Sequence, residues 1–265
     1  EDGTAWGVAA NSGNANACCP MSHEYAEEMA RLAARATGRA PADFVVASTG
    51  VIGQTLNIAA IRAGMPEAAA GLTAGPEGSD AAARAIMTTD TVKKELALAC
   101  SIGGRTVTLG AIAKGSGMIH PNMGTMLCFL TTDCAISPEM IKTALLETVG
   151  VTFNRISVDG DTSTNDTCCV LANGLAGNET ITAKGPDYDA FLEALRALCT
   201  ALAKKMAADG EGAKHLITCT VSGAADEAAA ETVAKSVISS TLTKAAIFGA
   251  DANWGRVLCA MGYSG

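Results

Sequence analysis

Apolar residues recur at helical spacing in two long segments of the chain. Residues 22–37 place their apolar positions three and four apart, and the next residue is Gly38, a residue type that commonly ends a helix. A longer stripe of the same kind runs from Tyr188 to Met206 and is closed by Gly210. Start signals and periodicity predict further helices over residues 79–87, 137–149 and 224–239.

Short apolar runs predict buried strands between these helices. They cover residues 44–47, 105–113, 126–131 and 216–221. Because helices and strands alternate along the chain, we predict an α/β fold with layered sheets flanked by helices.

The composition narrows the range of partners. Hydrophobic residues make up 49% of the 265 positions, the formal net charge is -8, and no cluster of Lys and Arg stands out. This balance argues against nucleic acid and against anionic membrane surfaces. The longest apolar stretches are far shorter than a membrane span, and nothing resembles a signal peptide. We therefore expect a cytoplasmic protein.

The ten cysteines do not form a recognisable framework. The adjacent pairs Cys18-Cys19 and Cys168-Cys169 lack the Cys-x-x-Cys spacing of zinc sites. Several others lie within apolar runs. We expect buried, reduced thiols rather than disulfides.

Apolar stretches lie close to both ends of the chain. Residues 6–10 follow the first residue almost at once, and residues 257–260 are followed by only five more. We therefore expect a longer parent protein that is truncated here at both ends.

Thr125 has an unusual setting. A glycine-rich loop, residues 114–124, ends directly before it, and the apolar run begins directly after it. Cleavage between Gly124 and Thr125 would create a threonine with a free amine. Such a residue carries its own nucleophile and its own base.

Several common site motifs are not matched. His120 stands where a dinucleotide-binding loop needs its third glycine, and Gly115 follows Lys114 where a Walker loop needs Ser or Thr. The acid-rich residues 159–166 resemble a calcium loop, but Val170 occupies the position of the bidentate Glu. We predict neither a metal nor a bound cofactor.

Four polar segments remain, and each also has an ordinary structural explanation. Residues 48–50 follow a strand and can offer an N–H and a hydroxyl to an oxyanion, although a plain turn is favoured. Residues 88–91 cap a helix or bind substrate. Lys114 is solvated or contacts a ligand. In residues 209–213, Glu211 lies in a helix-ending turn or pairs with an ammonium group.

Together these segments resemble the ornithine acetyltransferase (glutamate N-acetyltransferase) family of arginine biosynthesis. The resemblance covers essentially the whole chain. The matching strings are residues 11–18, 47–53, 86–91, 114–127, 158–166, 209–213 and 251–256.

Members of that family cleave themselves before the threonine, and the two products stay associated. The resemblance therefore implies an α portion, residues 1–124, and a β portion, residues 125–265, that assemble as a heterotetramer. It also implies the DmpA/ornithine acetyltransferase fold of N-terminal-nucleophile type. The family usually has Ala before the threonine, and Gly124 keeps a small residue there.

The resemblance also implies roles for individual residues. Thr49 and Gly50 would form an oxyanion hole. The residues expected at the substrate are Thr88, Lys114, Thr125 and Glu211. By charge, Glu211 would hold the ornithine ammonium and Lys114 a substrate carboxylate.

The implied reaction moves an acetyl group from N-acetylornithine to glutamate through acetyl-Thr125. Acetyl-CoA is a further candidate donor. Two alternatives to this acetyltransferase function remain. One is an N-terminal-nucleophile amidase or aminopeptidase, which passes the acyl group to water, and the other is an uncut, non-catalytic binding protein.

Overall fold

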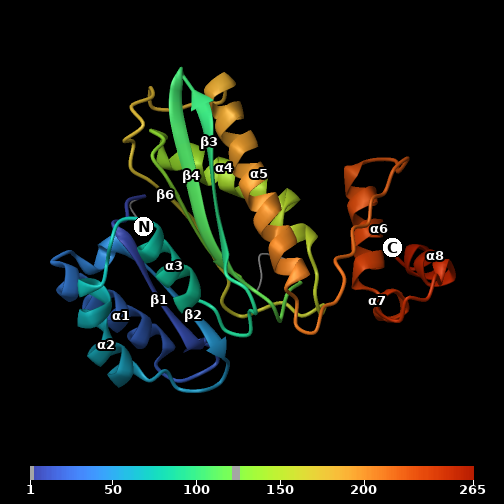
Figure 1. Cartoon of the computed structure of the whole chain (residues 1–265), viewed down its shortest axis with the longest axis horizontal. Helices are drawn as coiled ribbons and strands as arrows, with labels where there is room; N and C mark the ends of the chain where they lie inside the picture. Colours follow the sequence, from blue (N-terminus) through green and yellow to red (C-terminus); the bar gives the residue numbers. More distant parts are fainter. Residues whose placement is uncertain (1–2, 121–125) are drawn as a thin grey trace.

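Two β-sheets flanked by helices make up the main part of the protein (Figure 1). The computed structural model describes residues 3–120 and 126–265. The expected α/β fold with layered sheets is confirmed.

The first sheet is a parallel pair of strands, β1 (Gly7–Asn14) and β2 (Phe44–Val51). A parallel pair needs a crossover connection, and α1 (Ser22–Thr37) lies in it and packs on β2. Gly38 ends α1 in the left-handed conformation, with φ 70°. A second helix, α2 (Ile58–Ala70), packs on α1.

The second sheet has four strands in the order β3-β4-β5-β6. β3 (Lys94–Ile102) and β4 (Arg105–Lys114) form an antiparallel hairpin. The two residues of its turn, Gly103 and Gly104, both have positive φ, as the twist of a tight hairpin requires.

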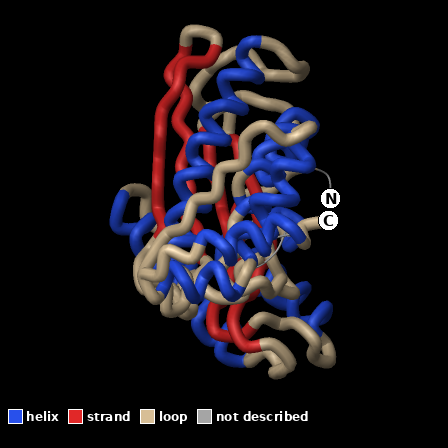
Figure 2. The backbone as a smooth tube through the Cα atoms, turned by 90° about the vertical axis from the view of Figure 1, so that its right-hand side faces the viewer, coloured by secondary structure: helices blue, strands red, loops and turns tan. Residues whose placement is uncertain are grey.

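The other half of this sheet is built differently. β5 (Leu127–Thr132) pairs antiparallel with β4 and parallel with β6 (Thr167–Ala172). The connection from β5 to β6 contains α4 (Pro138–Val151), which begins after the capping hydroxyl of Ser137. α5 (Pro186–Ala208) runs alongside β3 and β4 and contacts α4 (Figure 2).

The remaining elements are shorter. α3 packs on β3 and β4, whereas α6, α7 and α8 pack on one another and lie apart from the sheets (Figure 1). Within the described ranges, no helix has the length and apolar character that crossing a membrane requires. The bounds are η1 (Pro41–Asp43), α3 (Pro76–Ala85), η2 (Phe153–Arg155), α6 (Glu227–Ser239), α7 (Thr241–Phe248) and α8 (Trp254–Gly262).

β5 is buried on both faces. Cys128 and Leu130 point into the main core, which α5 covers. Leu127 and Phe129 point the opposite way and pack with Ala47 of β2. Because side chains alternate along a strand, only an uninterrupted apolar run can fill both layers. The run that predicted this strand is therefore explained by its place between two packed layers.

Most of the predicted elements are present, and one is wrong. Residues 216–221 form no strand: they have no regular secondary structure, and their backbone groups pair with no described strand. An apolar run shows which side chains favour burial, but a strand also needs a neighbouring edge to pair with. The segments that form β1, β3 and β6 were not predicted as strands.

We predict that Gly50→Ala strongly destabilises the fold. Gly50 has φ 131°, and an added Cβ would lie 2.6 Å from the Asn14 backbone nitrogen and closer still to Gly13. Backbone strain and overpacking together are expected to cost about 2–5 kcal/mol. Urea unfolding measures this loss. The control is Gly53→Ala, which also has positive φ but open space around it, and equal losses in the two variants would contradict the prediction.

Candidate functional site

The register of the four-stranded sheet gathers polar residues at one end. Lys114, the last residue of β4, lies opposite Leu127, the first residue of β5. Leu127 in turn lies opposite Thr167, the first residue of β6. Met126 and Asp166 directly precede these two strands. Lys114, Met126 and Asp166 are therefore neighbours at the same edge.

The other sheet contributes Thr49 to this place. The turn favoured for residues 48–50 is wrong, because they belong to β2 and Thr49 pairs with Ser12 of β1. The Lys114 ammonium donates a hydrogen bond of 3.1 Å to Thr49 Oγ1, and both side chains are buried. Since an ammonium can only donate, the Thr49 hydroxyl hydrogen is left to donate to another acceptor.

Lys114 is not the solvated lysine that was one of its two predicted states. It is 4% exposed, and burial lowers the pKa of its ammonium below the usual value. Asp90, Asp166 and Glu211 act against this shift, because their charges favour the protonated form, while Lys94 adds to the lowering. Carboxylates from three separate parts of the chain thus favour the charged form of Lys114 against the effect of its burial.

A second buried lysine lies beside this site. Lys94 begins β3, is fully buried, and donates to Asp90 Oδ1 at 2.6 Å, to Asp209 Oδ2 at 2.6 Å and to the Val92 carbonyl at 3.3 Å. Its three hydrogens therefore have three acceptors. Burial raises the pKa of Asp90 and Asp209, but Lys94 and backbone N–H groups outweigh it and hold both values below the usual range. We call Lys94, Asp90 and Asp209 the buried ion cluster.

The buried ion cluster connects the loops that carry the predicted site residues. Asp90 accepts from the backbone N–H of Gly115 at 2.8 Å and of Thr88 at 3.2 Å. The backbone carbonyl of Asp209 accepts from the Ser116 hydroxyl at 2.6 Å.

Glu211 joins the same loop. Its backbone N–H donates to the Ser116 carbonyl at 3.0 Å. The Glu211 carboxylate packs against the backbone of Gly117. A Cβ added to Gly117 would lie 2.5 Å from the carboxylate carbon. Only a glycine at 117 leaves room for the side chain in this position. The predicted residues Lys114 and Glu211 are therefore held on two adjoining turns.

Asp166 was given no role by the sequence. Its Oδ1 accepts from the Met126 backbone N–H, and its buried Oδ2 has no hydrogen-bond partner among the described residues. Burial raises the pKa of this carboxyl to about 7, although the Met126 N–H and Lys114 oppose the shift. Asn165 donates to the Ser48 carbonyl, so this loop also contacts β2.

The predicted site residues thus fall into two groups. The predicted cleavage residues Gly124 and Thr125 lie outside the described residues. Of the others, Thr88, Lys114 and Glu211 lie on the loops that the buried ion cluster joins. Thr49 accepts from Lys114, and Gly50 follows Thr49 in β2.

The sequence offered little that would have identified the additional residues. Asp90 and Asp209 stand in the strings that were singled out, but nothing in those strings shows that they share a cation. Lys94 follows another lysine, Lys93, and such a pair usually lies at the surface.

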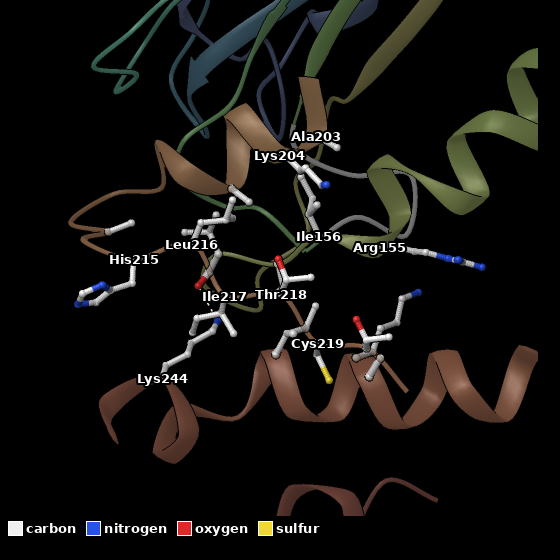
Figure 3. A pocket seen from close by; sticks show the side chains of 18 of the residues that line it. Arg155, Ile156, Ala203, Lys204, His215, Leu216, Ile217, Thr218, Cys219 and Lys244 are labelled. Carbon is white, nitrogen blue, oxygen red and sulfur yellow. Dashed lines mark hydrogen bonds between the residues drawn. The ribbon is translucent and has the colours of Figure 1, made fainter. Parts of the chain in front are cut away.

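A separate pocket of about 840 Å³ lies between the end of α5, the irregular residues 215–221 and α6 (Figure 3). Leu216, Thr218 and Cys219 line it. Of the predicted site residues that the structure describes, only Glu211 is among those that line it. The pocket is therefore distinct from the group of site residues around Lys114, and Glu211 belongs to both.

Two other features bear on the chemistry. Among the described residues, no group of three or more His, Cys, Asp and Glu side chains is arranged to hold a metal ion. All ten cysteines are unpaired, but the expectation that they are buried is only partly met, because Cys18 and Cys259 are exposed.

We predict that Asp166→Asn stabilises the protein at neutral and alkaline pH. A carboxyl whose pKa is raised on folding contributes stability below its unfolded pKa of about 4, and that contribution is lost as pH rises through about 7. The asparagine does not ionise, so its advantage should grow from pH 4 to pH 8 and reach about 1–3 kcal/mol.

Urea unfolding at several pH values measures this difference. Asp161→Asn, an exposed carboxylate of the same loop, is the matched control and should show no such trend. Parallel pH profiles for the wild type and Asp166→Asn would contradict the prediction.

Comparison with known proteins finds similarity along the whole length of the chain. Residues 1–265 match the model of the ArgJ family. The arginine biosynthesis bifunctional protein ArgJ of Symbiobacterium thermophilum is 56% identical over 266 residues, which cover 100% of this chain and 66% of that protein. ArgJ of Geobacillus kaustophilus is 49% identical, with 97% of this chain and 62% of that protein covered. The chain thus spans somewhat less than two thirds of the length of these relatives.

A solved structure of an ArgJ protein is also similar to this chain. The crystal structure of the arginine biosynthesis bifunctional protein ArgJ from Bacillus halodurans is 54% identical where it aligns, with a TM-score of 0.50. The alignment covers 52% of this chain and 64% of that chain. Taken with the family match over residues 1–265, these findings show that the chain belongs to the ArgJ family.

Proposed function

We propose that the protein is a glutamate N-acetyltransferase of arginine biosynthesis, which moves acetyl from N-acetylornithine to glutamate. The observation that carries this proposal is the hydrogen bond of 3.1 Å from Lys114 to Thr49 Oγ1. In this bond a cation lies beside a hydroxyl whose hydrogen has no acceptor among the described residues, at the sheet edge where Met126, the residue after Thr125, is held by Asp166. Oriented donors of this kind stabilise an oxyanion.

The first step is self-cleavage. The Thr125 hydroxyl attacks the Gly124 carbonyl, the peptide nitrogen leaves as the new amine of Thr125, and water hydrolyses the resulting ester. The products are an α portion of residues 1–124 and a β portion of residues 125–265, which stay associated as a heterotetramer. The new α-amine has a reference pKa of about 8, so it can accept a proton near neutral pH.

The second step is acetyl transfer. The Thr125 oxygen attacks the acetyl carbonyl of N-acetylornithine, and its proton passes to the Thr125 amine. The oxyanion accepts hydrogen bonds from the Thr49 hydroxyl and the Gly50 N–H. Collapse of the intermediate expels ornithine, which takes the proton, and leaves acetyl-Thr125. The glutamate amine then attacks the carbonyl of this ester, the bond from that carbonyl to the Thr125 oxygen breaks, and the amine proton returns to that oxygen. The product leaves as N-acetylglutamate.

Charge assigns the substrate contacts. Lys114 would hold a substrate carboxylate and Glu211 the ornithine ammonium, with Thr88 beside them on the loop that Asp90 holds. No bound cofactor takes part in this scheme, and acetyl-CoA would enter only as a second acetyl donor. The substrates belong to cytoplasmic metabolism, where we place the protein.

We predict that Thr125→Ala leaves a single uncut chain without acetyl transfer, because the variant lacks the attacking oxygen. Mass spectrometry of the full-length protein measures cleavage, and N-acetylglutamate formation measures transfer. Retained cleavage and activity would disprove the proposal. Release of acetate to water without transfer to glutamate would instead favour an amidase or aminopeptidase, and a wild type that stays uncut would favour a binding protein.

We predict that Thr49→Val lowers kcat about 10²–10³-fold, the usual effect of losing one oxyanion donor. The KM for N-acetylornithine should change far less, because the donor acts mainly on the transition state. Steady-state kinetics separate the two constants. Thr55→Val, at an exposed threonine of the next loop, is the control, and an equal effect in both variants would contradict the role.

A further inference from the structure

The buried ion cluster joins three segments that are distant in the chain. Residues 88–92 meet it through Asp90 and through the Thr91 and Val92 backbone N–H groups. Residues 114–117 meet it through Gly115. Residues 209–211 meet it through Asp209 itself. These segments depend on one fully buried ammonium, that of Lys94.

Each segment also carries one residue of the proposed substrate site. They are Thr88, Lys114 and Glu211. Lys114 and Glu211 have opposite charges, and the proposed donor has a carboxylate and a side-chain ammonium. A molecule with two charges is bound well only when both partners lie at the matching separation, because a displaced partner gives up its hydrogen bond.

Few hydrogen bonds separate Lys94 from the turns that carry Lys114 and Glu211. Asp90 accepts from Lys94 and from Gly115, the residue after Lys114. Asp209 is two residues before Glu211, and its carbonyl is bonded to Ser116 at 2.6 Å. Hydrogen bonds on both sides therefore fix the turn of Lys114 against the turn of Glu211.

We propose that Lys94, together with Asp90 and Asp209, is a positioning residue that sets the separation of Lys114 and Glu211 and thereby selects substrates that carry both a carboxylate and an ammonium. This inference rests on the proposed function. It adds that selectivity for the doubly charged donor depends on a side chain that touches no substrate.

The test compares three acetyl donors of matched carbon skeleton. N-acetylornithine has both charges, N-acetylnorvaline lacks the side-chain ammonium, and N-acetyl-1,4-diaminobutane lacks the carboxylate. For each, kcat/KM is measured with glutamate as acceptor. The preference for N-acetylornithine over each analogue is a ratio, so the fraction of folded or cleaved enzyme cancels from it.

Two variants disturb the cluster in different ways. Lys94→Met with Asp209→Asn removes one positive and one negative charge, so the net charge of the cluster is kept. Ser116→Ala removes only the 2.6 Å hydrogen bond to the Asp209 carbonyl and is the milder change. Lys93→Met is the matched control, because Lys93 is partly exposed and pairs with Asp80 and Glu95 outside the cluster.

The expected result is a loss of preference of about tenfold or more in the double variant, the size of one charge-assisted hydrogen bond. Ser116→Ala should shift the same ratio by a smaller factor, and Lys93→Met should leave it unchanged. KM for N-acetylornithine should rise more than kcat falls.

The outcomes separate the two proposals. A wild type without acetyl transfer would disprove the proposed function. An active wild type whose preference is unchanged in both cluster variants would overturn only the positioning role, since a purely structural cluster lowers activity toward all three donors alike. If the double variant does not fold, the ratio in Ser116→Ala decides.

Discussion

The site depends on one ammonium group that is removed from water. Lys94 is fully buried, and its three hydrogens are taken by two carboxylates and a carbonyl. A buried charge is tolerated only when every donor has a partner, and breaking such a pair typically costs about 3–5 kcal/mol. The chain must therefore bring Asp90 and Asp209 to the same place, and the loops attached to them follow.

The packing of the two sheets brings together the strand ends beside this cluster. Because β5 is apolar on both faces, it joins the main core under α5 to the smaller cluster at β2. The two sheets then stand close enough for Lys114 of one to reach Thr49 of the other. Sheet register places Met126 and Asp166 at the same edge. Packing of apolar layers and pairing of buried charges thus act on the same few strand ends.

Patterns among residues close together in the sequence predicted much of this architecture. α1, α4 and α5 follow directly from periodicity and capping residues, and β5 follows from its apolar run. The residues 216–221 show where such reasoning fails. Their pattern is that of a strand, yet among the described residues no strand pairs with them, and they line a pocket instead. Pairing depends on a partner edge, which no local pattern contains.

The sequence by itself determined the family, the fold class and most of the residues with a proposed chemical role, because these are carried by strings of adjacent residues. Thr49, Lys114 and Glu211 could be selected in this way. Only the tertiary structure decided that Lys94 joins the loops of Lys114 and Glu211 and that Asp166 has a raised pKa. A hydrogen bond between residues 115 positions apart sets the first property, and burial sets the second. Neither is encoded by the type of a residue or by its immediate neighbours.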